Sequence, residues 1–166
     1  MLAEFEKQKV QNDLIRRESR LTLLISLSLL ASIVVYTMVA LLVRGGAPAS
    51  KAVRDAWSVL NIVSILLIIG VLAVRKTIYF SPRLVRDDFS LTALLRRWRS
   101  IDIVLLSFAE LIAIFGLVIT LLGMPFARTF HFFVSAFLLA LINTPITWKV
   151  KDKVRTFEKY AGRSVL

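Results

Sequence analysis

The chain has 166 residues, 57% of them hydrophobic, and a formal net charge of +11. It contains no cysteine, which excludes disulfides, thiol catalysis and Cys-ligated metal sites. The apolar residues are gathered into four long blocks, and a helix needs ~20 apolar residues to span a bilayer. The sequence therefore predicts an all-α membrane protein with four transmembrane helices, at about residues 21–43, 56–74, 101–122 and 127–148.

The first span is preceded by a polar segment, residues 1–20. Val10, Leu14 and Arg17 of this segment follow helical spacing that leads to Leu21 at the start of the span. This segment is too charged for a cleavable signal, and no small-x-small site follows the first apolar block. We therefore expect the first span to be retained, with residues 1–20 as an amphipathic cytoplasmic segment.

Two further cytoplasmic segments are predicted to be amphipathic. Leu91, Leu94, Leu95 and Trp98 recur at i, i+3, i+4 and i+7, which predicts a helix in the headgroup layer that then turns into the third span. Residues 149–166 predict a basic helical tail that continues the fourth helix beyond a kink at Pro145. Either contact with lipid headgroups or docking of another subunit would use Arg96, Arg97, Trp98, Arg99, Lys149, Lys151 and Lys153.

The positive charges indicate the orientation. Of the 22 Lys and Arg residues, 18 lie in residues 1–20, 75–100 and 149–166. Since cytoplasmic segments retain Lys and Arg, this bias predicts a multi-pass protein with both termini inside (N-in/C-in), in a bacterial inner membrane. The basicity is then a matter of topology and lipid headgroups, and we predict no nucleic-acid binding. Trp57, Trp98 and Trp148 lie at or just outside block ends, where indoles favour the membrane interface.

Glu110 is the only charged residue in the third apolar block, residues 103–126. With helical geometry from Ile101, it lies ~13–14 Å deep, near the middle of a ~30 Å hydrocarbon core. No Lys or Arg lies within the core of any span to pair with it, so we expect a neutral, hydrogen-bonded carboxyl. Ser64 and Ser135 lie near its predicted depth and complete a candidate ion or proton site, whereas His131 lies ~9–10 Å nearer the outer surface.

A face of small residues runs along the same helix. Such residues let a second helix approach closely in lipid, where the hydrophobic effect no longer drives association. The partner is either the fourth helix of the same chain or a helix of another protomer. The face consists of Ala109, Ala113, Gly116, Thr120 and Gly123, at i, i+4, i+7, i+11 and i+14.

The run A-E-L-I-A-I-F-G-L-V-I-T-L, within residues 107–123, is similar to the carboxylate-bearing helix of rotor-ring subunit c of ion-translocating ATP synthases. In that family the carboxylate binds the transported proton or sodium ion, so the resemblance implies an ion-binding role for Glu110. The other helices depart from the family. Rotor subunits pack a Gly-rich helix against the carboxylate-bearing one, whereas here residues 21–43 contain no glycine and residues 57–74 contain only Gly70. The polar Arg-Gln-Pro loop of that family is also missing from this chain.

Catalytic patterns are not evident, since there is one histidine, no Gly-rich phosphate loop and no H-E-x-x-H spacing. We therefore predict a non-enzymatic structural or accessory subunit of an oligomeric membrane complex, with no catalytic residues, cofactor or metal. Its expected partners are the lipid bilayer and other membrane-protein subunits or copies of itself. The alternative is a proton- or cation-translocating component that uses Glu110.

The predicted orientation can be tested with single cysteines, because the chain has none of its own. We expect cysteines at Lys7, Lys76 and Lys159 to resist an impermeant thiol reagent in intact cells, and one at Ser50 to react. Labelling of the Lys159 position from outside would contradict the N-in/C-in orientation.

Overall fold

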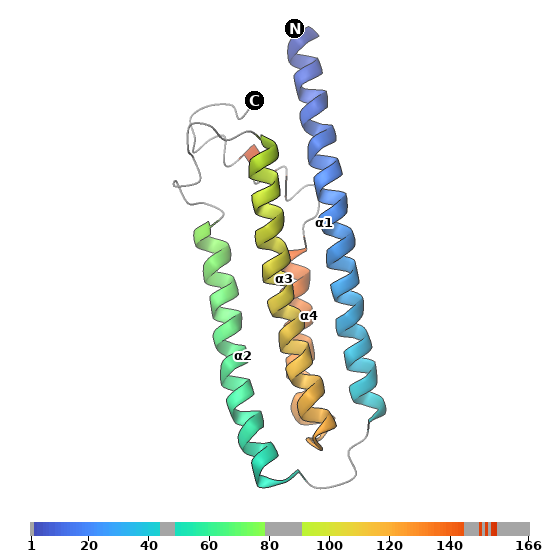
Figure 1. Cartoon of the computed structure of the whole chain (residues 1–166), viewed down its shortest axis with the longest axis vertical. Coiled ribbons are helices and arrows are strands. Elements are labelled where there is room, and N and C mark those ends of the chain that lie inside the picture. Colours follow the sequence, from blue (N-terminus) through green and yellow to red (C-terminus); the bar gives the residue numbers. More distant parts are fainter. Residues whose placement is uncertain are drawn as a thin grey trace.

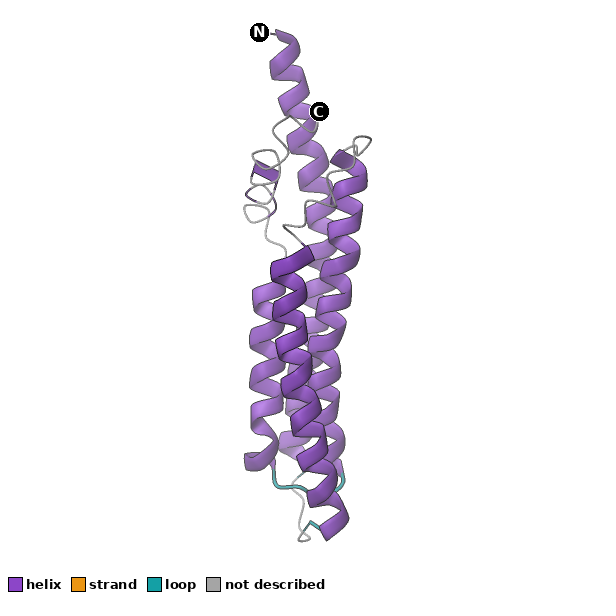
Figure 2. Ribbon diagram, turned by 90° about the vertical axis from the view of Figure 1, so that its left-hand side faces the viewer, coloured by secondary structure: helices purple, strands orange, loops and turns teal. Residues whose placement is uncertain are grey.

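The computed structural model describes residues 2–43, 49–78, 91–144, 150, 152 and 154–155. They include four helices, α1 (Leu2–Leu42), α2 (Lys51–Ile78), α3 (Leu91–Leu121) and α4 (Phe126–Asn143). The helices run side by side along one long axis (Figure 1; Figure 2). Each contains a segment long and apolar enough to cross a membrane. The prediction of an all-helical chain with four candidate membrane spans is therefore confirmed.

Two helices extend past their predicted spans. α1 has 41 residues and is therefore ~60 Å long, about twice the ~30 Å hydrocarbon core. Residues 1–20 and 21–43, predicted as separate units, thus belong to one helix from Leu2 onward. α3 has 31 residues and begins at Leu91. The structure differs here from the prediction, because residues 91–98 continue into the third span with no break at which the chain could turn.

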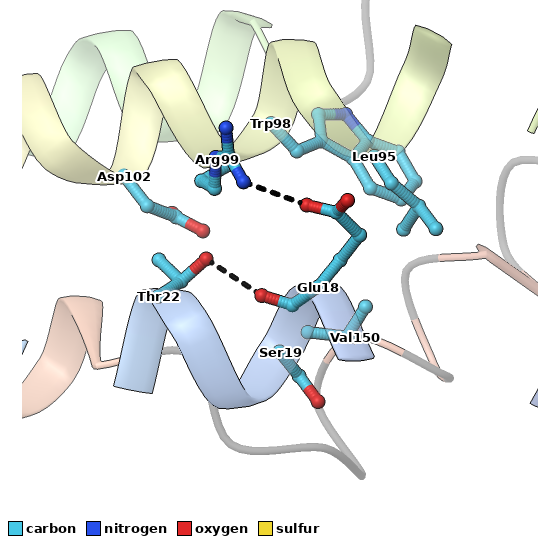
Figure 3. A pocket seen from close by; sticks show the side chains of 8 residues that line it. All are labelled: Glu18, Ser19, Thr22, Leu95, Trp98, Arg99, Asp102 and Val150. Carbon is cyan, nitrogen blue, oxygen red and sulfur yellow. Dashed lines mark hydrogen bonds and ion pairs between the residues drawn. The ribbon is translucent and has the colours of Figure 1, made fainter. Parts of the chain in front are cut away.

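The apolar stripe at the start of α3 has a protein partner instead of the headgroup layer. Leu94, Leu95 and Trp98 are buried, and only 3% of Trp98 is exposed. They belong to the same buried cluster as Ile15 of α1 and Val150, and Figure 3 shows Leu95, Trp98 and Val150 lying together beside α1. Packing against α1 removes the apolar surface of these side chains from water, which insertion into the headgroup layer would otherwise have done.

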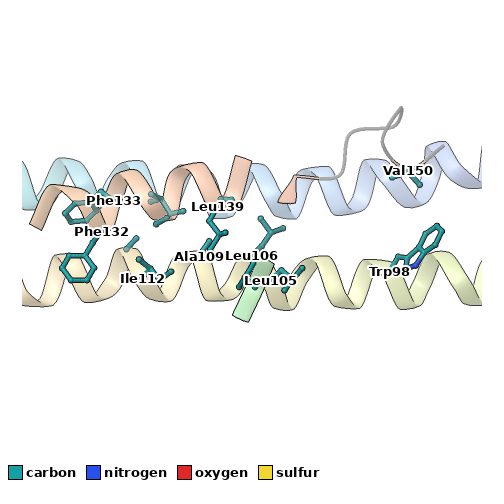
Figure 4. Close-up of a cluster of buried hydrophobic side chains, with 14 of the residues drawn as sticks. Trp98, Leu105, Leu106, Ala109, Ile112, Phe132, Phe133, Leu139 and Val150 are labelled. Atoms are coloured by element: carbon teal, nitrogen blue, oxygen red, sulfur yellow. The ribbon is translucent and has the colours of Figure 1, made fainter. Parts of the chain in front are cut away.

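α3 and α4 form an antiparallel hairpin at the centre of the bundle, where apolar side chains of both helices meet (Figure 4). The small-residue face of α3 packs against α4 of the same chain: Ala109 and Ala113 are fully buried. At Gly116 the approach is so close that an added Cβ would lie 2.8 Å from the Cβ of Phe132. Of the two partners considered for this face, the structure contains the intramolecular one.

Gly123 ends α3 rather than extending the packing face. Its φ of 102° is a left-handed conformation that glycine adopts without steric strain. The Met124 N–H donates to the Ile119 carbonyl at 3.1 Å, and the Gly123 N–H donates to the Thr120 carbonyl at 3.0 Å. These two bonds form a Schellman motif, which satisfies the last carbonyls of α3 and turns the chain directly into α4.

α1 and α2 lie on opposite sides of this hairpin (Figure 1). α1 packs against α3 and α4, whereas α2 packs mainly against α3 and much less extensively. Along α2 only Ser64 and Val71 are buried among the residues whose exposure is described. α2 is therefore the most peripheral helix of the bundle.

α4 ends earlier than predicted, at Asn143. Thr144 is extended (φ −62°, ψ 121°), as expected for a residue that precedes proline. The Asn143 amide donates to the Leu139 carbonyl at 2.8 Å, and the Thr144 hydroxyl donates to the Ala140 carbonyl at 2.9 Å. The Thr144 N–H also donates to the Leu141 carbonyl at 3.4 Å, so the helix stops before Pro145 with Thr144 bonded to two of its last carbonyls. The predicted kink and the end of the span at 148 lie outside the described residues.

Gly116→Ala should weaken the hairpin, because the added Cβ would clash with the Phe132 Cβ at 2.8 Å. We expect a net loss of ~1–3 kcal/mol, even after Ala contributes its higher helix propensity. The midpoint of thermal unfolding in detergent, followed by circular dichroism, measures the effect. Gly70→Ala is the matched control, since nothing lies within 4 Å of its added Cβ, and it should be neutral or slightly stabilising. Equal midpoints for Gly116→Ala and the wild type would contradict the close approach.

Candidate functional site

The carboxyl of Glu110 is held at the seam between α1 and α3. The Tyr36 hydroxyl donates to Glu110 Oε1 at 3.2 Å. Arg99, three turns earlier on α3, also contacts α1, so Glu110 lies on the α1-facing side of α3. The side chain of Glu110 is half-buried. We expected a hydrogen-bonded carboxyl, but sequence reasoning missed Tyr36 as its partner, although this is the only tyrosine within a predicted span.

The two serines predicted to complete this site do not bond to Glu110. Among the described residues, no hydrogen bond joins Ser64 or Ser135 to Glu110, and the Ser64 hydroxyl has no partner although the residue is only 4% exposed. Ser64 belongs to α2, which lies across the hairpin from α1 (Figure 1). The structure therefore does not bring the predicted ion-site residues together.

A polar cluster that the sequence analysis did not predict joins α1 to α3 near the start of α3 (Figure 3). Arg99 Nη1 and Glu18 Oε2 are 2.9 Å apart, and the Thr22 hydroxyl donates to the Glu18 carbonyl at 3.0 Å. Asp102 is also buried here, 4% exposed. The apolar blocks gave no sign of this cluster, because Glu18 precedes the first block and Asp102 lies immediately before the third. The cluster surrounds a cavity of about 20 Å³, enough for one water molecule.

The residues predicted to contact headgroups or a partner divide into three groups. Arg96 and Arg97 are exposed, as that role requires. Arg99 is 34% exposed and paired with Glu18, and Trp98 is buried inside the bundle. Lys149, Lys151 and Lys153 lie outside the described residues.

The seam between α2 and α4 has its own polar contacts, near the turn that joins α3 to α4. His131 Nε2 and Asn61 Oδ1 are 3.2 Å apart. The Trp57 indole N–H donates to the Arg128 carbonyl at 3.3 Å, and its ring meets that of His131 edge-on with centroids 6.2 Å apart. His131 is thus separate from Glu110, as its predicted depth indicated, and it contacts α2 instead.

Polar contacts therefore join three pairs of helices. Besides those already described, Thr120 and Thr129 lie 2.8 Å apart and join α3 to α4. Within the described part of the chain, no three His, Asp or Glu side chains are grouped so that they could hold a metal ion. A hydrogen bond between membrane helices contributes on average ~0.6 kcal/mol, with a maximum near ~1.7 kcal/mol. Chemically, this arrangement is suited to fixing helices relative to one another.

A double-mutant cycle with Tyr36→Phe and Glu110→Leu should measure the α1–α3 hydrogen bond. We expect a coupling free energy of ~0.6 kcal/mol, up to ~1.7 kcal/mol, from unfolding in mixed micelles. The control is a cycle of Tyr36→Phe with Thr129→Val, which acts between α3 and α4. The effects of these two substitutions on the free energy of unfolding should be additive. Additivity of Tyr36→Phe with Glu110→Leu would show that this bond does not stabilise the bundle.

No family model matches the chain, and no curated protein or solved structure matches it.

Proposed function

We propose that this protein is a non-enzymatic integral membrane protein that acts as a structural or accessory subunit of an oligomeric membrane complex. The observation that carries the proposal is that the polar side chains at the helix seams contact a neighbouring helix. Glu110 accepts a hydrogen bond from Tyr36, and Glu18 pairs with Arg99. Side chains engaged in this way stabilise a fixed arrangement of helices, which a scaffold requires.

The length of α1 supports docking to another subunit. A helix of ~60 Å exceeds the hydrocarbon core by ~30 Å. Figures 1 and 2 show its N-terminal turns extending past the start of α3. This projection gives a second protein a helical surface outside the bilayer.

We further propose that both termini face the cytoplasm of a bacterial inner membrane. The described charges support this orientation, because exposed arginines gather at the end of the bundle where α3 begins. Arg96 and Arg97 lie on α3, and Arg16 and Arg17 lie on α1 next to Glu18, the partner of Arg99. Positively charged residues are retained on the cytoplasmic side of spans.

The second candidate function is proton or cation translocation through Glu110. Two observations favour it. Glu110 is half-buried rather than sealed, and its described partner, the Tyr36 hydroxyl, is itself able to release and accept a proton. A carboxyl near mid-membrane with such a neighbour resembles the groups found in proton relays.

Substitution of Glu110 separates the two functions. Glu110→Gln keeps an oxygen that accepts from Tyr36 but cannot titrate, whereas Glu110→Leu removes both properties. If the role is structural, we expect Glu110→Gln to preserve the complex and Glu110→Leu to lower the midpoint of its thermal unfolding. Glu110→Leu should also lower the amount of intact complex that native mass spectrometry detects after gentle solubilisation of the membranes. Ser107→Leu is a matched control, because Ser107 is exposed on α3 and bonds only to its own helix.

Loss of ion uptake from an intact complex would favour translocation. If Glu110→Gln leaves the mass of the complex unchanged but abolishes proton or sodium uptake into proteoliposomes, the structural proposal is wrong. The same native mass spectra test the subunit role directly, since a protein that runs as an isolated single chain in every mild detergent is not part of a stable complex.

A further inference from the structure

Three arginines form an exposed patch on α1 where the apolar span begins. Arg16, Arg17 and Arg20 are exposed, and with Asp13 and Leu21 they line an open groove of about 480 Å³. Asp13 is the acidic residue of this groove and lies about two turns before Arg20, on the side away from the apolar span. The patch is therefore positive where it borders the hydrocarbon.

The patch faces away from the bundle. On the opposite side of α1, Ile15, Ser19 and Thr22 are buried against the other helices. Steps of 100° per residue set Arg17 and Arg20 roughly opposite these positions. Glu18, the nearest acidic residue that is not in the groove, is already paired with Arg99. The guanidinium groups are thus directed toward the surroundings of the protein.

The same side of α1 becomes an apolar stripe as the helix continues. Leu24 is 64% exposed, Leu27 51% and Met38 60%. Leu24 follows Arg20 by about one turn and lies on the same side of the helix. A charged patch therefore passes directly into a lipid-facing apolar stripe along one helix face.

We propose that this face binds one anionic phospholipid. Its phosphate would accept charge-assisted hydrogen bonds from Arg16, Arg17 and Arg20, since the planar guanidinium matches the geometry of a phosphate. Its acyl chain would lie along Leu24 and Leu27. A phospholipid fits both the arginine patch and the apolar stripe, because its charged headgroup is joined directly to an apolar chain, just as the patch is followed directly by the stripe along α1. A soluble phosphate or an acidic protein segment would use the arginines alone.

The test uses the full chain in nanodiscs made from an equal mixture of phosphatidylcholine and phosphatidylglycerol. After extraction into mild detergent, native mass spectrometry counts the lipids of each class that the protein retains. We expect the wild type to retain phosphatidylglycerol preferentially. The triple variant Arg16→Gln, Arg17→Gln, Arg20→Gln should lose this preference, on the order of fivefold for each arginine. If the triple variant folds poorly, Arg17→Gln alone should reduce the preference by about that single factor.

Two controls make the site specific. The variant Lys51→Gln, Arg54→Gln, Arg128→Gln removes three exposed positive charges at the other end of the bundle and should keep the preference. Inorganic phosphate alone should not raise the thermal midpoint of the wild type in detergent, whereas phosphatidylglycerol should.

The proposal is overturned if the Arg16, Arg17, Arg20 variant retains phosphatidylglycerol as the wild type does. It is also overturned if the control variant loses as much preference, which would indicate general charge attraction. Stabilisation by inorganic phosphate equal to that by phosphatidylglycerol would likewise overturn it, in favour of a simple anion site.

Discussion

Two helices in hydrocarbon are held together mainly by the fit of their surfaces and by interhelical hydrogen bonds, because lipid tails are as apolar as the side chains they would replace. In this chain the closest fit is at Gly116, where the α3 backbone lies against Phe132 of α4. The tight turn at Gly123 returns the chain so that Thr120 and Thr129 meet within 2.8 Å. α1 and α2 then pack against the flanks of this hairpin, so their positions depend on it.

At the seam between α1 and α3, long side chains make the polar contacts that join the two helices, whereas Thr120 and Thr129 meet only because α3 and α4 lie so close together. The short hydroxyls of α1 bond to their own helix: Ser26 donates to the Thr22 carbonyl and Thr37 to the Ile33 carbonyl, each at 2.8 Å. Such bonds satisfy a hydroxyl in hydrocarbon without a partner helix. The long side chains of Tyr36 and Arg99 extend far enough to cross the α1–α3 seam.

The four candidate spans could be predicted from the sequence, and so could the buried small residues from Ala109 to Thr120, because both depend on composition and helical spacing alone. The partner of Glu110 could not be predicted in this way. Depth was counted along the backbone, which puts Tyr36 ~22 Å from Leu21 and Glu110 only ~13–14 Å from Ile101. Helical side chains tilt toward the N-terminus, so a long tyrosine on α1 extends back toward the level of Glu110.

Trp98 illustrates a different limit. A stripe of leucines with one tryptophan has the same spacing whether it faces lipid headgroups or another helix, and only the packed structure distinguishes these two environments. The same holds for Ser64, whose helix lies across the hairpin from α1. Helical periodicity says which residues share a face, not which helix that face meets.

The arrangement of the helices also constrains the order in which the protein assembles during synthesis. α1 and α2 hardly touch each other, and their packing surfaces are provided by α3 and α4. The first half of the chain must therefore enter the membrane before any of its tertiary partners exists. The most apolar windows of α1, α2 and α3 have mean hydropathies of 2.3, 2.5 and 2.5, whereas that of α4 is 1.5. The earlier helices are apolar enough to partition into lipid by themselves, and the last, least apolar helix inserts when α3 is already present to receive it.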